Sequence, residues 1–436
     1  MSVLEADILI DGCSIVTMNK RGLIEDGVIA IKDDRIIYVG KRKNLKVKTE
    51  KILYGKGKVA LPGLVNCHTH VAMTLFRGVA EDKPLNEWLK NTIWPLEIKL
   101  TREDVYKGAL LGCLEMIKTG TTCFSDMYFY EDAVADACIK SGLRGVLAAG
   151  IIDIGFEGVG KRLMKEAIEI IKRYNGAEGR VNVRFGPHAT HTCTKETLMQ
   201  IREKADEFKV GVHMHVEESR EEVDFIKKQF GLTPFEYLNE IGFLKSDVLV
   251  AHCTYISKYE IEILAKKNVS VSHNPIANAK LGMGIAPAWE MMERGVNIGL
   301  GTDGPACNNT FDMFETMKFA ALIQKARLKN AKIMPMKKVL EMATVNGAKA
   351  LQLEDRIGSI EVGKKADIIL VNLGGVHLRP NHDIYANLIY AVKGFDVDTT
   401  IVNGRILMEN KEVKILDEDK VIEEAEKSAY RLVEKI

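Results

Sequence analysis

The sequence predicts a (β/α)₈ barrel of the TIM type with a second, smaller and discontinuous β-sandwich domain. Between residues 61 and 359, short apolar runs such as VNVRFGPH, VGVHMH and VLVAH alternate with helical stretches of about 10 to 15 residues, which is typical of parallel βα units. On both sides of this region, β-rich runs are separated by glycine and aspartate turns. The length of 436 residues suits a barrel and one smaller domain.

The order of these patterns predicts the domain organisation. We expect residues 1–60 and 360–436 to form a composite β-sandwich, in which the two similar β regions pair across the barrel. The charged stretch DEDKVIEEAEKSAYRLVEKI should form a C-terminal helix of this unit. Residues 61–359 then form the barrel.

The composition is that of a soluble globular protein, with 46% hydrophobic and 28% charged residues. A formal net charge of +1 offers no basic excess for nucleic acid or an anionic membrane, so we expect neither as a partner. The N-terminal stretch MSVLEADILIDG lacks the basic and long apolar regions of a signal peptide, and we expect a cytoplasmic protein. The eight cysteines include no CxxC pair, so buried thiols are expected instead of disulfides.

Histidines gather at the ends of the apolar runs. Eight of the ten lie in the barrel region, and the carboxyl ends of barrel strands form the face where active sites of this fold lie. His68 and His70, in LPGLVNCHTH, are two residues apart, so strand alternation points both imidazoles to the same side. They can share a metal ion, although a buried pair bonded to the backbone is the alternative for this motif alone.

Two further residues complete a candidate metal site. His215, in HMHVEES, and Asp303, in GLGTDG, follow other apolar runs. Three imidazoles and one carboxylate suit Zn²⁺, or iron if it is supplied, and leave room for a water molecule. His213 is the rival ligand from the same run, or else a packed core histidine. We prefer His215 because Glu218 follows it closely, where the chain can turn an acid into the barrel mouth.

The motifs PGLVNCHTH, HVEES, AHC, SHNPIANAKLGMGIAP and GLGTDGPACNN together resemble the amidohydrolase superfamily, and within it the 5-methylthioadenosine/S-adenosylhomocysteine deaminase group. The resemblance covers nearly the whole chain. It implies one metal ion per chain, with His252 near the metal-bound water and with the ligands His68, His70, His215 and Asp303. Binuclear relatives use a carboxylated lysine at the end of the fourth strand, and the matching segment, VNVRFGPHATH, contains no lysine.

The resemblance also implies a reaction, the hydrolytic deamination of 5'-substituted adenosines at C6. Methylthioadenosine, S-adenosylhomocysteine, 5'-deoxyadenosine and adenosine all remain open as substrates. Zinc lowers the pKa of a bound water toward about 7. Asp303 is placed to take the proton of that water, and Glu218 to deliver a proton to the ring nitrogen.

Substrate contacts follow from the same resemblance. Glu97, in WPLEIKL, resembles the acid that accepts hydrogen bonds from the ribose hydroxyls, and His188, in FGPH, resembles a residue that bonds the purine or sugar. Trp88 packs against the nucleoside or, alternatively, only in the core. Arg162, in GVGKRLMKE, is the nearest candidate for an arginine that binds the amino-acid carboxylate of S-adenosylhomocysteine, with a plain surface position as its alternative.

Two other functions explain less of the sequence. A guanine deaminase or triazine chlorohydrolase of the same superfamily would not need the nucleoside-type contexts of Glu97 and His188. A non-catalytic scaffold on a degenerate barrel would not need the complete ligand set. We expect a small-molecule nucleoside as the substrate and a homo-oligomer as the assembly. The sequence assigns no individual roles to His273, Asn274 and Asn278.

Overall fold

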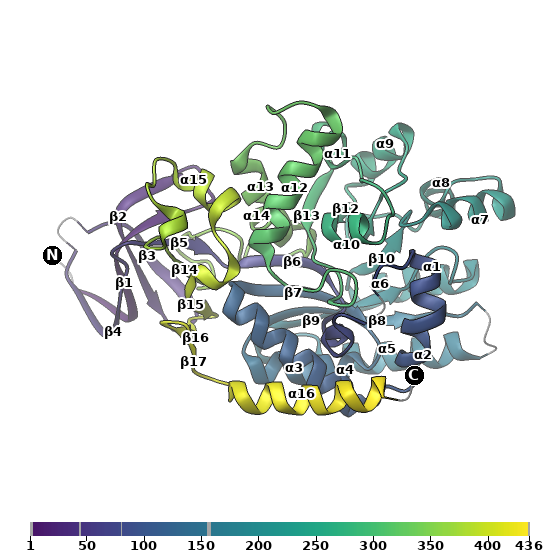
Figure 1. Cartoon of the computed structure of the whole chain (residues 1–436), viewed down its shortest axis with the longest axis horizontal. Coiled ribbons are helices and arrows are strands. Elements are labelled where there is room, and N and C mark those ends of the chain that lie inside the picture. Colours follow the sequence, from purple (N-terminus) through teal and green to yellow (C-terminus); the bar gives the residue numbers. More distant parts are fainter. Residues whose placement is uncertain (1–2, 43–44, 80, 155–157, 435–436) are drawn as a thin grey trace.

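Eight parallel strands in chain order form a nearly closed barrel in the computed structural model, which describes residues 3–42, 45–79, 81–154 and 158–434 (Figure 1). Each strand is hydrogen-bonded to the next, and the first and last lie beside each other. The strands are β6 (Leu64–Thr69), β7 (Thr121–Tyr128), β8 (Arg144–Ile151), β9 (Val181–Pro187), β10 (Val212–Val216), β11 (Val248–His252), β12 (Ser270–His273) and β13 (Asn297–Leu300). The predicted barrel is therefore confirmed.

Helices connect the barrel strands, and their ends match local sequence signals. Thr101 makes a capping box at the start of α3, and Gly120 ends that helix with a left-handed φ of 87°. The helices are α1 (Leu85–Trp88), α2 (Trp94–Glu97), α3 (Arg102–Thr119), α4 (Glu131–Ser141), α5 (Val159–Tyr174), α6 (Lys195–Phe208), α7 (Arg220–Phe230), α8 (Pro234–Glu240), α9 (Lys258–Lys267), α10 (Pro275–Lys280), α11 (Ala288–Glu293), α12 (Met313–Leu328), α13 (Met336–Met342) and α14 (Val345–Ala350). None of the helices in the described ranges is long and apolar enough to cross a membrane.

A second, mixed sheet joins the two ends of the chain, because β5 pairs antiparallel with β14. Its order is β17-β16-β15-β14-β5-β1-β2-β3, with β4 paired to β1. The strands are β1 (Leu4–Val16), β2 (Leu23–Lys32), β3 (Arg35–Lys41), β4 (Val47–Tyr54), β5 (Lys58–Pro62), β14 (Ile368–Asn372), β15 (Val397–Val402), β16 (Arg405–Glu409) and β17 (Glu412–Val413). The domain boundaries near residues 60 and 360 stay a prediction, since β5 runs directly into the barrel strand β6.

The C-terminal helix α16 (Glu418–Val433) forms as expected and lies against the barrel helix α3 (Figure 1). Ion pairs join the two helices near both ends, Lys118 with Glu418 and Arg431 with Asp104. The last helix thus packs on the barrel, although the strands that precede it belong to the mixed sheet. All eight cysteines are buried and free, as the sequence led us to expect.

A buried ion pair connects the barrel to the mixed sheet. Arg144, at the start of β8, donates from Nε to one oxygen of Asp367 over 2.8 Å and from Nη2 to the other oxygen over 3.0 Å. The two side chains are 0% and 2% exposed. Asp367 also accepts the backbone N–H of Asn403, and its carbonyl accepts the N–H of Gly63. Such a bidentate pair fixes both charges in one geometry.

We predict that Arg144→Met strongly destabilises the protein, because it leaves the Asp367 carboxylate buried without its partner. Removing one member of a buried pair costs about 3–5 kcal/mol. The midpoint of urea denaturation, followed by circular dichroism, should fall accordingly. Lys427→Met is the control, since it removes only the exposed pair with Glu423 and should change stability by less than about 0.5 kcal/mol. Equally small shifts in both variants would contradict a connecting role for Arg144.

Candidate active site

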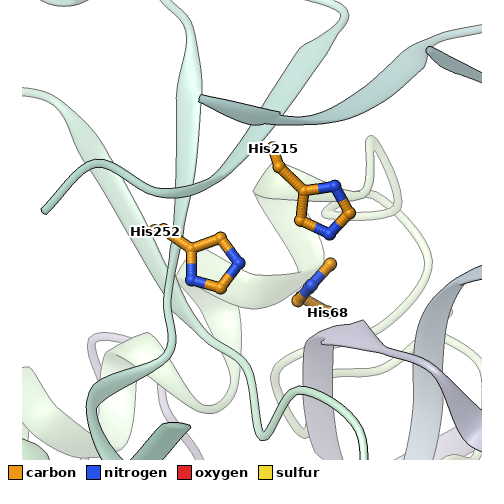
Figure 2. Close-up of side chains that lie close together, drawn as sticks. All are labelled: His68, His215 and His252. Carbon is orange, nitrogen blue, oxygen red and sulfur yellow. The ribbon is translucent and has the colours of Figure 1, made fainter. Parts of the chain in front are cut away.

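The predicted metal ligands meet at the carboxyl end of the barrel. Nε2 of His70 lies 3.3 Å from Oδ1 of Asp303, and Nε2 of His68 lies 3.6 Å from the same oxygen. Nε2 of His215 lies 3.4 Å from Nε2 of His70. His252, the last residue of β11, approaches the same point, and Figure 2 shows its ring facing those of His68 and His215. Residues far apart in the sequence therefore present their ligand atoms to one common centre.

Each of these imidazoles is held from behind through its Nδ1 atom. Nδ1 of His68 lies 2.9 Å from Nε2 of His213, and Nδ1 of His70 lies 2.5 Å from the Met127 carbonyl oxygen. Nδ1 of His215 lies 2.8 Å from the His188 carbonyl oxygen, and Nδ1 of His252 lies 2.9 Å from Oδ1 of Asn278. Since a neutral imidazole carries one ring proton, a proton engaged at Nδ1 leaves Nε2 with its lone pair free. Histidines that bind metals nearly always have this second bond.

The donor set fits a divalent metal ion. Nε2 of His68 is buried and has no hydrogen-bond partner among the described residues. Burial, reinforced by the neighbouring histidines, lowers the pKa values of His68 and His215 well below their usual range, so both rings stay neutral. Neutral imidazoles beside a carboxylate are the ligands such a cation requires. His213, the rival ligand, instead lies behind His68.

Asp303 presents its two carboxylate oxygens to different neighbours. Oδ1 faces the ligand histidines and accepts the backbone N–H of Gly304 over 2.7 Å, whereas Oδ2 lies 4.0 Å from Nε2 of His252. The residue has a left-handed φ of 66°, and its N–H donates to the carbonyl of His68 over 3.0 Å. Strained backbone of this kind clusters at active sites, where the surrounding structure maintains it. One carboxylate can therefore ligate a cation through one oxygen and exchange a proton through the other.

Glu218 lies beside this cluster. Its Oε1 lies 3.7 Å from Nε2 of His252. Burial raises the pKa of Glu218 above its ordinary value, which favours the protonated, proton-donating form. Glu222 holds the backbone of Glu218 in place, because its carboxylate accepts the N–H of Glu218 over 3.1 Å and the hydroxyl of Thr190 over 2.6 Å.

A cavity of about 380 Å³ opens from the metal ligands and is lined by Glu97, His188 and Trp88. The Tyr128 hydroxyl donates to Glu97 over 2.7 Å. Burial raises the pKa of Glu97 to about 7, although the bond from Tyr128 opposes the shift. His188 bonds Thr192 through Nδ1 over 3.0 Å. The cavity thus combines apolar walls with a few fixed polar groups, as small-molecule sites do.

The structure does not bring Arg162 to this cavity. Its side chain is exposed on α5 and pairs with Glu166 one helical turn later, at 3.5 Å, and it is absent from the described residues that line the cavity. This position matches the surface alternative, because the Arg162 side chain is exposed and its ion-pair partner lies on the same helix.

Several residues of the site escaped the sequence reasoning. Asn278, which had no assigned role, holds His252, and Tyr128 holds Glu97. Asp126 accepts the Thr69 hydroxyl and the Val71 N–H, on both sides of His70. Asp126 could have been found from the run TTCFSDMY. A carboxylate inside a buried strand is costly unless it is hydrogen-bonded, so its presence there indicates a specific partner.

Comparisons with known proteins show the family of the chain. The pattern of the amidohydrolase family matches residues 59–407. The chain is 48% identical to a 5'-deoxyadenosine deaminase of Methanosarcina acetivorans, over 98% of this chain and 99% of the relative. It is 46% identical to a 5-methylthioadenosine/S-adenosylhomocysteine deaminase of Moorella thermoacetica, over 97% and 99%.

A solved structure shows the same likeness in three dimensions. The crystal structure of an adenosine deaminase from Xanthomonas campestris with bound zinc superposes with a TM-score of 0.96, at 32% identity and over 100% of both chains. The sequence match extends over most of the chain, and the superposition covers both the barrel and the mixed sheet. The chain therefore belongs to the amidohydrolase family.

Proposed function

We propose that this protein hydrolyses the C6 amino group of 5'-substituted adenosines and releases ammonia and the inosine analogue. The proposed substrates are 5-methylthioadenosine, S-adenosylhomocysteine, 5'-deoxyadenosine and adenosine. One observation carries the proposal: a single cavity is lined by Glu218, by Glu97 and by four residues of the metal-ligand cluster, His70, His215, His252 and Asp303. The deaminase names of the similar proteins from Methanosarcina acetivorans and Moorella thermoacetica support the same reaction.

The proposed cofactor is one Zn²⁺ per chain, held by His68, His70, His215 and Asp303, with iron as an alternative occupant. Three nitrogens and one oxygen form a donor set that suits zinc. When bound, zinc lowers the pKa of water toward about 7 and so makes a nucleophile available near neutral pH. The zinc in the similar structure from Xanthomonas campestris supports this choice. The lysine-free end of β9 supports a single ion.

The acidic residues of the cavity divide the proton transfers between them. Asp303 takes a proton from the attacking water through Oδ2, the oxygen on the side of His252. Glu218 donates a proton to the purine ring nitrogen, so that C6 accepts the attack. His252 orients the water through Nε2, which lies within 4.0 Å of both acids. General acid and base help of this kind contributes about 10²–10⁴ in rate.

The remaining cavity residues bind the nucleoside. Glu97, fixed by Tyr128, accepts hydrogen bonds from the ribose hydroxyls. His188 bonds the purine or sugar, and Trp88 packs against the nucleoside. We assign no substrate contact to Arg162, because its side chain lies on the outer surface. A cytoplasmic location and a homo-oligomeric assembly stay predictions.

We predict that the zinc-loaded protein releases ammonia from all four adenosine analogues with a higher kcat/KM than from guanine, because only nucleosides use the ribose site at Glu97. Steady-state ammonia release measures the turnover of the nucleosides and of guanine, and chloride release measures any turnover of a chlorinated triazine. Turnover of guanine or triazine without turnover of the nucleosides would favour the other enzyme classes. A protein that binds no metal and turns over none of these compounds would favour the scaffold.

We predict that Glu218→Gln retains the metal and loses at least about 10²-fold in kcat, because the amide keeps the shape of the side chain but has no proton to transfer. Asp224→Asn is the matched control, since Asp224 is an exposed acid of the next helix, paired with Arg220. The control should retain wild-type kcat. A metal-replete Glu218→Gln variant with wild-type kcat would assign Glu218 to structure alone.

We predict that Glu97→Ala lowers kcat/KM for ribonucleosides by about 10²–10⁴, since two hydrogen bonds to a carboxylate are worth roughly 1.5–3 kcal/mol each. The 2',3'-dideoxy analogues cannot make these bonds in either protein. The same substitution should therefore affect them much less. This double comparison separates the contact from general damage to the fold. Equal losses on both substrate types would rule out a ribose-binding role for Glu97.

A further inference from the structure

His213 is a buried histidine to which the proposed reaction gives no role. It lies in β10, two residues before His215, and it is absent from the lining of the cavity. Its Nε2 lies 2.9 Å from Nδ1 of His68, and its Nδ1 lies 3.1 Å from the hydroxyl oxygen of Ser125 in β7. A chain of hydrogen bonds therefore runs from Ser125 through His213 to the metal ligand His68.

The ligand at one end fixes the direction of these bonds. His68 binds a cation through Nε2 only if that atom carries no proton, so the proton of the neutral ring lies on Nδ1. The Nδ1–H of His68 then donates to Nε2 of His213. His213 in turn carries its proton on Nδ1 and donates it to the Ser125 oxygen. Every member of the chain has a partner in this arrangement, and no charge is needed.

We propose that His213 is a positioning residue, which holds His68 in the tautomer and ring orientation that metal binding requires. This inference rests on the proposed metal ligands. Among the described residues, His213 is the only partner of Nδ1 of His68. His70 and His215 bond backbone carbonyls instead, and no side-chain substitution removes those acceptors. His68 is therefore the ring whose orientation depends on another buried ring.

His273 provides a matched control within the same barrel. It ends β12, is 1% exposed, and neither of its ring nitrogens has a hydrogen-bond partner among the described residues. Its replacement removes a buried imidazole of the same size at a strand end. The control therefore reports the general cost of such a change without loss of a bond to a ligand.

The test is the affinity for Zn²⁺ of the chelator-stripped protein, measured by competition with a chromophoric chelator. His213→Phe should weaken zinc binding by about 10–100-fold, the usual effect of removing a group that holds a ligand. His213→Gln should recover much of the loss, because its amide oxygen can accept the His68 proton. Ser125→Ala should weaken binding in the same direction but less. His273→Phe should retain an affinity close to that of the wild type.

The outcomes decide the inference as follows. Wild-type affinity in folded His213→Phe and Ser125→Ala overturns it, as does an equal loss in His273→Phe. If His213→Phe does not fold, Ser125→Ala decides alone: weaker binding supports the inference and unchanged binding overturns it. A wild-type protein that binds no zinc overturns the metal assignment as well, so the two failures are distinguishable.

Discussion

The hydrogen bonds at the Nδ1 atoms of four histidines are the constraint on which the site depends. They turn the rings of His68, His70, His215 and His252 so that the Nε2 atoms face one centre. Without them, each imidazole could rotate or exchange its proton between its nitrogens, and a cation would have to order all the rings as it bound. The barrel supplies the acceptors from strands β7 and β10, from the loop after β9 and from helix α10, so the fold itself preorganises the ligand set.

The same arrangement separates binding from proton transfer. The cation site uses one side of the Asp303 carboxylate, while the other oxygen faces His252 and, beyond it, Glu218. Burial lowers the pKa values of His68 and His215, which keeps these two ligands neutral, and raises the pKa of Glu218, which favours its protonated form. The same buried environment thus favours histidines that can bind a cation and an acid that can donate a proton. Glu97 lines the same cavity, where Tyr128 holds it outside the set of metal ligands, and this suits a substrate that carries a sugar next to its reacting base.

The sequence was sufficient to predict the barrel and the main ligands, because strand ends of a parallel barrel meet at one face whatever their distance along the chain. Strand alternation alone did not separate His213 from His215, since both point to the same side of β10, and the preference for His215 rested on the position of Glu218. The two histidines differ in their depth in the barrel. A strand rises about 3.3 Å per residue, so His213 lies roughly one layer of side chains deeper than His215. His68 and His70 can both reach the site because β6 ends at Thr69 and a 3-10 helix begins at Val71, so His70 no longer follows the line of the strand. Arg162 and Asn278 lie in helices, and their places depend on which side of each helix packs against the barrel. Tyr128 ends strand β7, but its bond to Glu97 depends on where helix α2 lies, which no local pattern specifies.

Anomalous diffraction from crystals of the zinc-loaded protein tests the central claim most directly, because it locates the metal relative to each ring nitrogen. The account predicts one zinc ion about 2.0–2.2 Å from Nε2 of His68, His70 and His215 and from an oxygen of Asp303. A zinc ion bound through Nδ1 of one of these rings, a second ion of equal occupancy, or a metal outside this cluster would contradict it.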